Sequence, residues 1–157
     1  MEHLAITGQP ELVLDNISYF WSMSNNGILV YLPRGVGSLA SSLVWIDRLG
    51  IEIPFADVRF NCKYPRIAPD GRHVAVPVYG RATHIQIFDA VSGIPSRLTF
   101  DEGYSSHPVW SPDGNWLGYQ ADYQHNIDLF AIRIDGREET RLTTTPAFDG
   151  EPDWILD

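Results

Sequence analysis

Short apolar segments alternate with turns along the chain, and no stretch of useful length shows the 3.6-residue period of an amphipathic helix. The clearest unit runs from His107 to Asp122, where an apolar strand, the turn Ser111-Pro112-Asp113-Gly114 and a second apolar strand follow one another. Pro112 presets φ at the first central turn position, and Gly114 accepts the positive φ that closes the turn. This pattern predicts a β-hairpin.

The hairpin recurs at a fixed interval. The same unit surrounds Gly71, a degenerate copy surrounds Gly27, and Pro152-Asp153-Trp154 begins a further copy, each 43 or 44 residues from the next. A second series of turns keeps almost the same interval and separates a third from a fourth short strand, at Gly8, Gly50, Gly93 and Gly136. Two turn series with one period of about 43 residues predict four strands per repeat, as in a β-propeller blade.

We therefore predict an all-β fold of β-propeller blades, each of four antiparallel strands, with about three complete blades and a partial blade at each end. Residues 1–15 are expected to be the outer strands of a preceding blade, and residues 16–56, 57–100 and 101–143 the three complete blades. Residues 144–157 are expected to begin a further blade with its inner strand. Trp45, Trp110 and Trp154 lie on predicted strands, where packing between blades is expected.

A family resemblance lies in these same residues. The run Trp110-Ser111-Pro112-Asp113-Gly114, with Arg-Leu-Thr at the end of two repeats (97–99 and 141–143), resembles the TolB-type β-propeller repeat. The segment YPRIAPDGRHVAV, residues 64–76, is also similar to propeller repeats that follow bacterial Ser/Thr kinase domains. The resemblance extends over nearly the whole chain and implies a propeller fold, but such propellers serve many functions.

Charge and composition limit the classes of partner that the chain could bind. A formal net charge of −9 and a single lysine, Lys63, argue against binding to the nucleic-acid backbone or an anionic membrane. Cys62 is the only cysteine, which excludes an internal disulfide. No basic and apolar leader opens the sequence and no apolar run spans a membrane, so the chain as written is expected in the cytoplasm. The TolB resemblance implies the periplasm if the chain is part of an exported parent.

Loop residues supply the candidate binding site. In propeller geometry, the loops before each inner strand and those between the second and third strands share one face, around the channel mouth. Tyr, Arg and His at loop tips are typical contact residues. The predicted ligand- or partner-binding residues are Tyr79, Arg81, His84, Asp101, Tyr104, His107, Tyr123 and His125. The alternative is that these are ordinary solvated loops.

Motifs of catalysis and metal binding are missing from the sequence. It has no Gly-x-Ser-x-Gly elbow and no Gly-rich phosphate loop, and its five histidines form no short-spaced ligand pair. Asp70 and Asp113 occupy matching turn positions, which indicates a structural role. We therefore predict no catalytic residue, no cofactor and no metal.

Three functions remain open. The first is a non-catalytic module that binds a protein, a peptide or another ligand. The second is a propeller-type enzyme, a glycosidase or lyase, that uses channel carboxylates, and the third is a structural fragment of a larger kinase- or peptidase-linked propeller. The outer faces of the terminal blades are expected to be apolar, so another surface must cover them. The cover could be a second copy in a homodimer, closure of the chain as a roughly four-bladed ring, or blades outside the sequence. We favour the homodimer, with no nucleic-acid partner and no membrane insertion.

Overall fold

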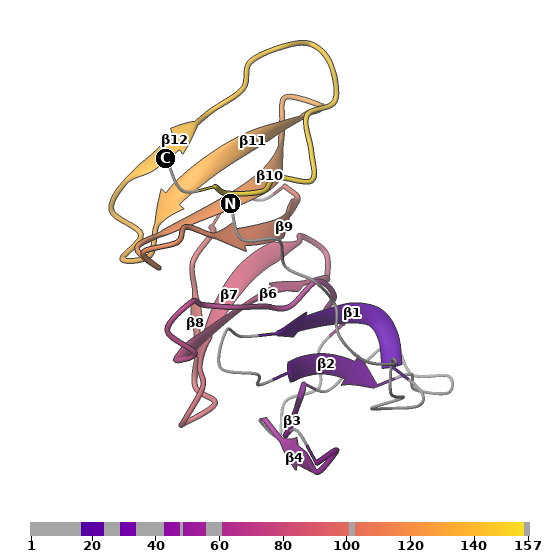
Figure 1. Ribbon diagram of the computed structural model, residues 1–157. Coiled ribbons are helices and arrows are strands. Elements are labelled where there is room, and N and C mark those ends of the chain that lie inside the picture. Colours follow the sequence, from indigo (N-terminus) through magenta and orange to yellow (C-terminus); the bar gives the residue numbers. More distant parts are fainter. Residues whose placement is uncertain are drawn as a thin grey trace, which may run out of the picture.

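The computed structural model describes residues 17–23, 29–33, 43–47, 49–55, 61–100 and 103–155. They form three four-stranded antiparallel sheets and no helix (Figure 1). Blade 1 contains β1 (Ile17–Met23), β2 (Leu29–Pro33), β3 (Val44–Ile46) and β4 (Glu52–Pro54). Blade 2 contains β5 (Arg66–Ile67), β6 (His73–Val78), β7 (His84–Asp89) and β8 (Pro95–Arg97). Blade 3 contains β9 (Ser105–Trp110), β10 (Trp116–Tyr123), β11 (Asn126–Arg133) and β12 (Glu139–Arg141).

Within each blade, neighbouring strands in the chain are neighbours in the sheet, so each blade is a simple meander. The three blades follow one another as successive layers in Figure 1. The predicted all-β fold of four-stranded antiparallel blades is confirmed. The expected strands at residues 1–15 lie outside the described residues, and residues 152–155 form no strand.

The turns follow the predicted chemistry. Gly71 and Gly114 close the turns between first and second strands with φ of 71°, and Gly50, Gly93 and Gly136 close the second series with positive φ as well. Gly8 and Gly27 lie outside the described residues. The Asp113 carboxylate accepts hydrogen bonds from the Ser111 hydroxyl and the Asn115 amide, and these bonds, that of Ser111 first, lower its pKa to about 2. The carboxylates in these turns therefore serve the backbone.

Two apolar clusters lie between the blades. The cluster between blades 1 and 2 contains Val30, Leu43, Phe55, Cys62, Ile67, Val74, Val76 and Phe88. The cluster between blades 2 and 3 contains Ala68, Ala75, Ile85, Ile87, Leu98, Trp110, Leu117, Tyr119, Ala121 and Ile132. Each blade therefore packs an apolar face against the next blade. Cys62 lies in the first of these clusters, and its burial raises the pKa of the thiol to about 12.

Trp110 joins two inner strands. Its ring is only 8% exposed in the cluster between blades 2 and 3, and its Nε1 donates a 2.9 Å hydrogen bond to the Arg66 carbonyl of β5. Ser22 of β1 bonds β5 in a similar way, since its hydroxyl accepts from the Ile67 amide at 3.2 Å. The inner strands of successive blades are thus held together by side chain–backbone hydrogen bonds as well as by apolar packing.

The Arg-Leu-Thr motif fixes the outer strand to the third strand in blades 2 and 3. The hydroxyls of Thr99 and Thr143 accept hydrogen bonds from the Ile85 and Leu129 amides, at 2.9 and 3.0 Å. The guanidinium groups of Arg97 and Arg141 then donate from Nε to the carbonyls of the same threonines. Each threonine therefore satisfies an amide of β7 or β11, and each arginine satisfies the carbonyl of the threonine that follows the outer strand.

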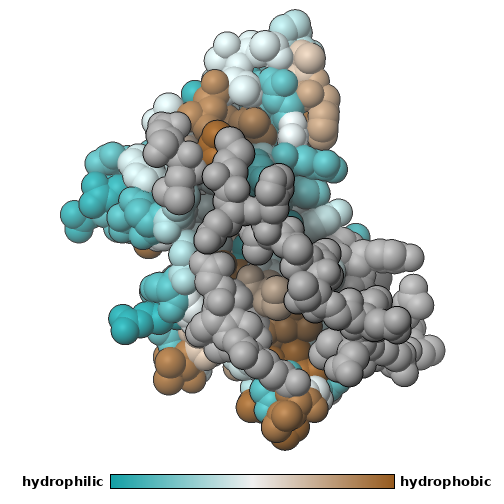
Figure 2. All heavy atoms as spheres, in the orientation of Figure 1, coloured by the Kyte–Doolittle hydropathy of each residue, from teal (hydrophilic) through white to brown (hydrophobic). Residues whose placement is uncertain are grey.

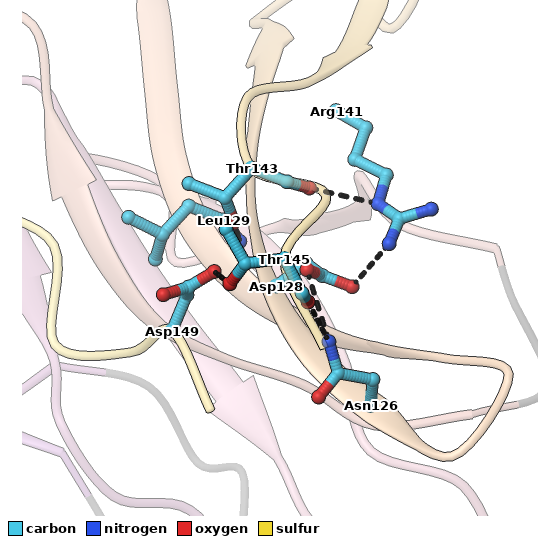
Figure 3. A network of polar contacts seen from close by, with 7 residues as sticks. All are labelled: Asn126, Asp128, Leu129, Arg141, Thr143, Thr145 and Asp149. Carbon is cyan, nitrogen blue, oxygen red and sulfur yellow. Dashed lines mark hydrogen bonds and ion pairs between the residues drawn. The ribbon is translucent and has the colours of Figure 1, made fainter. Parts of the chain in front are cut away.

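Blade 3 adds a buried carboxylate to this arrangement (Figure 3). Asp128 is fully buried, and its Oδ2 lies 2.7 Å from Nη2 of Arg141 while its Oδ1 accepts from Asn126. Blade 2 has His84 at the equivalent place, 44 residues earlier, beside Arg97. The ion pair is therefore specific to blade 3, whereas the Arg-Leu-Thr bonds are common to both blades.

We expect Trp110→Ala to lower the free energy of unfolding by about 3–5 kcal/mol, because it empties a ring-sized volume in the interblade cluster. Trp110→Phe keeps most of the volume and loses the bond to Arg66, so it should cost about 1 kcal/mol from the hydrogen bond alone. Urea denaturation followed by circular dichroism measures both. An unchanged midpoint for Trp110→Ala would show that this ring does not hold blades 2 and 3 together.

Thr99→Val should cost about 1–3 kcal/mol, because the substitution removes the hydroxyl partner of a buried amide at Ile85. Thr143→Val is the matched control. It removes the same bond in blade 3, where Leu129 is half-buried and water can replace the hydroxyl, so its cost should be smaller. Equal losses for the two variants would contradict this account.

Candidate functional site

Backbone hydrogen bonds bring the loops of neighbouring blades together on one face. The Thr83 amide donates to the Gly103 carbonyl, and the Ser105 amide donates to the Thr83 carbonyl. The Asp122 amide donates to the Tyr104 carbonyl, so the loop before β9 bonds both to the β6–β7 loop and to the β10–β11 hairpin. We call this surface, made by residues 61–64, 79–83, 103–106, 122–126 and 145–151, the loop face.

Aromatic and polar side chains meet on the loop face at the border between blades 2 and 3. The Tyr79 hydroxyl lies 2.8 Å from the Ser106 hydroxyl, and the rings of Tyr79 and Tyr104 have centroids 6.4 Å apart. The ammonium of Lys63 lies 5.4 Å from the Tyr79 ring centroid. Burial raises the pKa of Tyr79 well above its ordinary value, so this phenol stays protonated and available for hydrogen bonding.

Three residues at equivalent positions of the repeat share an uncommon backbone conformation. Tyr64, His107 and Glu151 have φ of 52°, 51° and 54°, they are 43 and 44 residues apart, and each precedes a proline. A residue before proline normally prefers negative φ and an extended backbone, so these positions are strained. The pairing of β9 with β10 shifts register between Ser106 and Val109, which places His107 in a β-bulge.

The bulge turns His107 onto a neighbouring ring. The imidazole packs against the Tyr64 ring with centroids 4.0 Å apart. Its Nδ1 is buried without a hydrogen-bond partner among the described residues. Desolvation lowers the pKa of His107 and the charge of Arg66 lowers it further, while Glu151 opposes the shift. The imidazole is therefore neutral near pH 7, with one nitrogen unsatisfied.

Charged residues complete this group. The Arg66 guanidinium donates to the Pro65 carbonyl at 3.1 Å and reaches the Trp21 carbonyl at 3.5 Å. Burial lowers the pKa of Arg66, and the charge of Asp153 opposes that shift. Equivalent positions of successive repeats thus present a phenol, a guanidinium, an imidazole and two carboxylates. We call Tyr64, Arg66, His107, Glu151 and Asp153 the inner-strand cluster.

The predicted site residues fall into separate groups. Tyr79 and Tyr104 lie together at the border of blades 2 and 3, where Tyr79 contacts Ser106, the neighbour of His107 in the chain. His107 itself belongs to the inner-strand cluster through its contact with Tyr64. Tyr123 instead lies under the Arg141 guanidinium, 4.3 Å from it, and near Phe130. His107 was predicted among the loop residues, but β9 begins two residues earlier and holds it within a bulge of the inner strand.

The other predicted site residues make no hydrogen bond or ring contact with the group at the border of blades 2 and 3 in the part of the chain that the structure describes. His84 is the first residue of β7, where its Nε2 lies 3.1 Å from Nε2 of Gln86 and desolvation lowers its pKa. Arg81 and His125 are exposed in loops, and Asp101 lies outside the described residues.

Sequence reasoning missed Tyr64, Arg66, Glu151 and Asp153. The available signal was the X-Pro dipeptide that recurs with the repeat at Pro65, Pro108 and Pro152. When the repeats are aligned on those prolines, the position before the proline holds Tyr64, His107 and Glu151. The position after the proline holds Arg66 and Asp153.

Within the described residues, no three His, Cys, Asp or Glu side chains gather closely enough to hold a metal ion. The same residues include no helix that is long and apolar enough to cross a membrane. Ser106 is bonded to the Tyr79 hydroxyl, which is a weak base for activating a nucleophile. The arrangement is therefore suited to hydrogen bonding and stacking.

Stability should fall as the pH drops from about 7 to 5. The folded state resists protonation of His107, whereas the unfolded state binds that proton near the ordinary pKa of about 6.5, so acid favours unfolding. His107→Asn should flatten this dependence, since asparagine tolerates positive φ and does not titrate. His125→Asn, at another position of positive φ, is the matched control. Urea midpoints measured at both pH values should decrease less with acid for His107→Asn than for wild type.

No protein-family profile matches the chain. A TolB homologue of Chlorobaculum tepidum is 34% identical over 80 residues, which cover 50% of this chain and 18% of that protein. TolB from Agrobacterium tumefaciens superposes with a TM-score of 0.78 at 22% identity, over 87% of this chain and 50% of the other. An oligogalacturonate lyase of Vibrio parahaemolyticus superposes with a TM-score of 0.66 at 15% identity, over 87% and 45%.

The chain thus spans half or less of each of these proteins. The likeness to the solved structures establishes the fold, since their sequences are less than 25% identical to this one. The curated TolB homologue matches at the level of sequence over half of the chain. Fold and sequence agree that the chain consists of β-propeller blades whose repeats are similar to those of TolB proteins.

Proposed function

We propose that the chain is a non-catalytic binding module that takes a protein or peptide segment on its loop face. The observation that carries the proposal is the convergence of Tyr79, Tyr104 and the His107–Tyr64 stack where blades 2 and 3 meet. Tyrosine supplies broad contact area and a hydrogen-bonding tip with few rotatable bonds, which makes it a frequent anchor in recognition surfaces.

The chemistry of the neighbouring residues supports a polar, extended ligand. Peptide backbones offer alternating donors and acceptors, and the inner-strand cluster offers both kinds of group within one region. The imidazole of His107 lies between the opposite charges of Arg66 and Glu151. With a net charge of −9, the chain favours segments that carry basic side chains.

Selection from a displayed peptide library, followed by calorimetric titration of the enriched peptide, tests this proposal. Tyr104→Ala should weaken binding about tenfold or more while leaving the melting temperature nearly unchanged, because the ring is a contact and is only half-buried. Val91→Ala is the control. Val91 is 94% exposed in the β7–β8 turn, at the opposite end of the strands from the loop face.

Failure of the library to yield any binder, or equal effects of the two substitutions, would contradict a binding site on the loop face. A collapse of the melting temperature in Tyr104→Ala would instead assign this ring to packing.

A second candidate function has one observation in its favour. Glu151 and Asp153 are carboxylates of the inner-strand cluster, and a lyase is among the similar folds. Incubation with oligogalacturonate, with ultraviolet detection of an unsaturated product, tests for lyase activity. Turnover that disappears in Glu151→Gln would favour the enzyme over the binding module.

A further inference from the structure

The arginine of the Arg-Leu-Thr motif is held in nearly the same way in blades 2 and 3. Its Nε donates to the carbonyl of the threonine two residues later, at 2.7 Å for Arg97 and 2.8 Å for Arg141. An aromatic ring also lies against each guanidinium, with Cζ 5.3 Å from the Phe100 centroid in blade 2 and 4.3 Å from the Tyr123 centroid in blade 3. The two guanidinium groups are therefore oriented by contacts of the same two kinds.

A carboxylate completes the arrangement in blade 3 but not in blade 2. Nη2 of Arg141 lies 2.7 Å from Oδ2 of the fully buried Asp128 (Figure 3). His84 occupies the equivalent place in blade 2, and Arg97 forms no ion pair within the described residues. Arg97 is also exposed, whereas Arg141 is half-buried. The guanidinium of Arg97 is therefore oriented as in blade 3 and lacks the anion that blade 3 supplies.

His84 does not supply the missing negative charge. Its Nε2 lies 3.1 Å from Nε2 of Gln86, and desolvation, followed by the charge of Arg97, lowers the pKa of the imidazole. The ring is therefore neutral near pH 7. Arg81, in the loop that precedes β7, is exposed and adds a second positive charge to this blade. Neither arginine is paired with a carboxylate in the part of the chain that the structure describes.

The surface beside Arg97 combines one charge with one exposed ring. Figure 2 shows hydrophobic residues gathered at the lower end of the molecule, where blade 1 lies in Figure 1, and the exposed apolar side chains of that blade include Leu49, Ile51 and Ile53. Phe100 follows β8 on blade 2, at the other end of the strands from the β3–β4 turn, and is 72% exposed. A guanidinium against a single exposed ring suits a small acid with an apolar group.

We propose that Arg97 binds the carboxylate of an external ligand and that Phe100 contacts the apolar group that carries this carboxylate. Blade 3 supplies the template, since Arg141 holds a carboxylate on Nη2 while its Nε stays bonded to the threonine carbonyl. The net charge of −9 weakens anion binding, but charges beyond about 8 Å are largely screened at physiological ionic strength, so the groups in contact decide. This site uses none of the aromatic residues that carry the proposed peptide binding, and it is therefore a separate site.

Titration of the whole ¹⁵N-labelled chain with 3-phenylpropanoate at constant ionic strength, followed by NMR of the arginine Nε–H groups, tests the proposal. The Arg97 signal should shift and saturate with a Kd on the order of 10 mM, as expected for one charge-assisted pair. The Arg141 signal should stay in place, because Asp128 already fills that site. The uncharged 3-phenylpropanamide should bind about tenfold more weakly or not at all. Equal shifts at both arginines, or equal affinities for the acid and the amide, would overturn the proposal.

A pair of substitutions at His84 tests the comparison between blades. His84→Asp places a carboxylate where blade 3 has Asp128, so it should occupy Arg97 and weaken 3-phenylpropanoate binding about tenfold or more. His84→Asn is the matched control, because it has the same shape without the charge, and it should bind like wild type. Binding that survives in His84→Asp, or is lost equally in both variants, would also overturn the proposal. The peptide titration with Tyr104→Ala is independent of this result, so either site can fail while the other stands.

Discussion

Packing of one sheet against the next is the interaction on which this structure depends. A single four-stranded blade satisfies its own backbone within the sheet, but its apolar residues lie on both faces and remain exposed until another blade covers them. Blade 2 shows the complete arrangement, with Val74, Val76 and Phe88 buried on one face and Ala75, Ile85 and Ile87 on the other. Stability therefore resides between repeats, as in other stacked-repeat proteins.

The fold was largely predictable because its signals are local and repeated. A proline and a glycine at set places in a turn require particular φ values, and Gly71 and Gly114 adopt them. The Arg-Leu-Thr motif was recognised as a family feature, but its physical role was not apparent from sequence. The structure shows that role, in which Thr99 satisfies the amide of Ile85, a contact between residues on different strands.

The candidate site was only partly predictable, because its geometry contradicts a local rule. Residues before proline favour an extended backbone, so nothing in Tyr64-Pro65 or His107-Pro108 predicts a positive φ. At His107 that conformation lies in the bulge where β9 pairs with β10, so it depends on a contact between two strands. The partners of each residue are equally non-local, since His107 contacts Tyr64 from another blade. Loop position alone indicated Tyr79 and Tyr104, whose rings the structure places 6.4 Å apart.

The three equivalent positions of positive φ separate backbone shape from side-chain chemistry. Tyr64, His107 and Glu151 are an aromatic, an imidazole and an acid, and yet their backbones are nearly superimposable in φ. Three different side chains share this backbone bend, so the bend does not depend on which side chain occupies the position. These equivalent positions therefore tolerate different chemistry within one backbone shape. Substitutions at these positions can therefore change what the surface binds, one position at a time, without disturbing the fold of the blades.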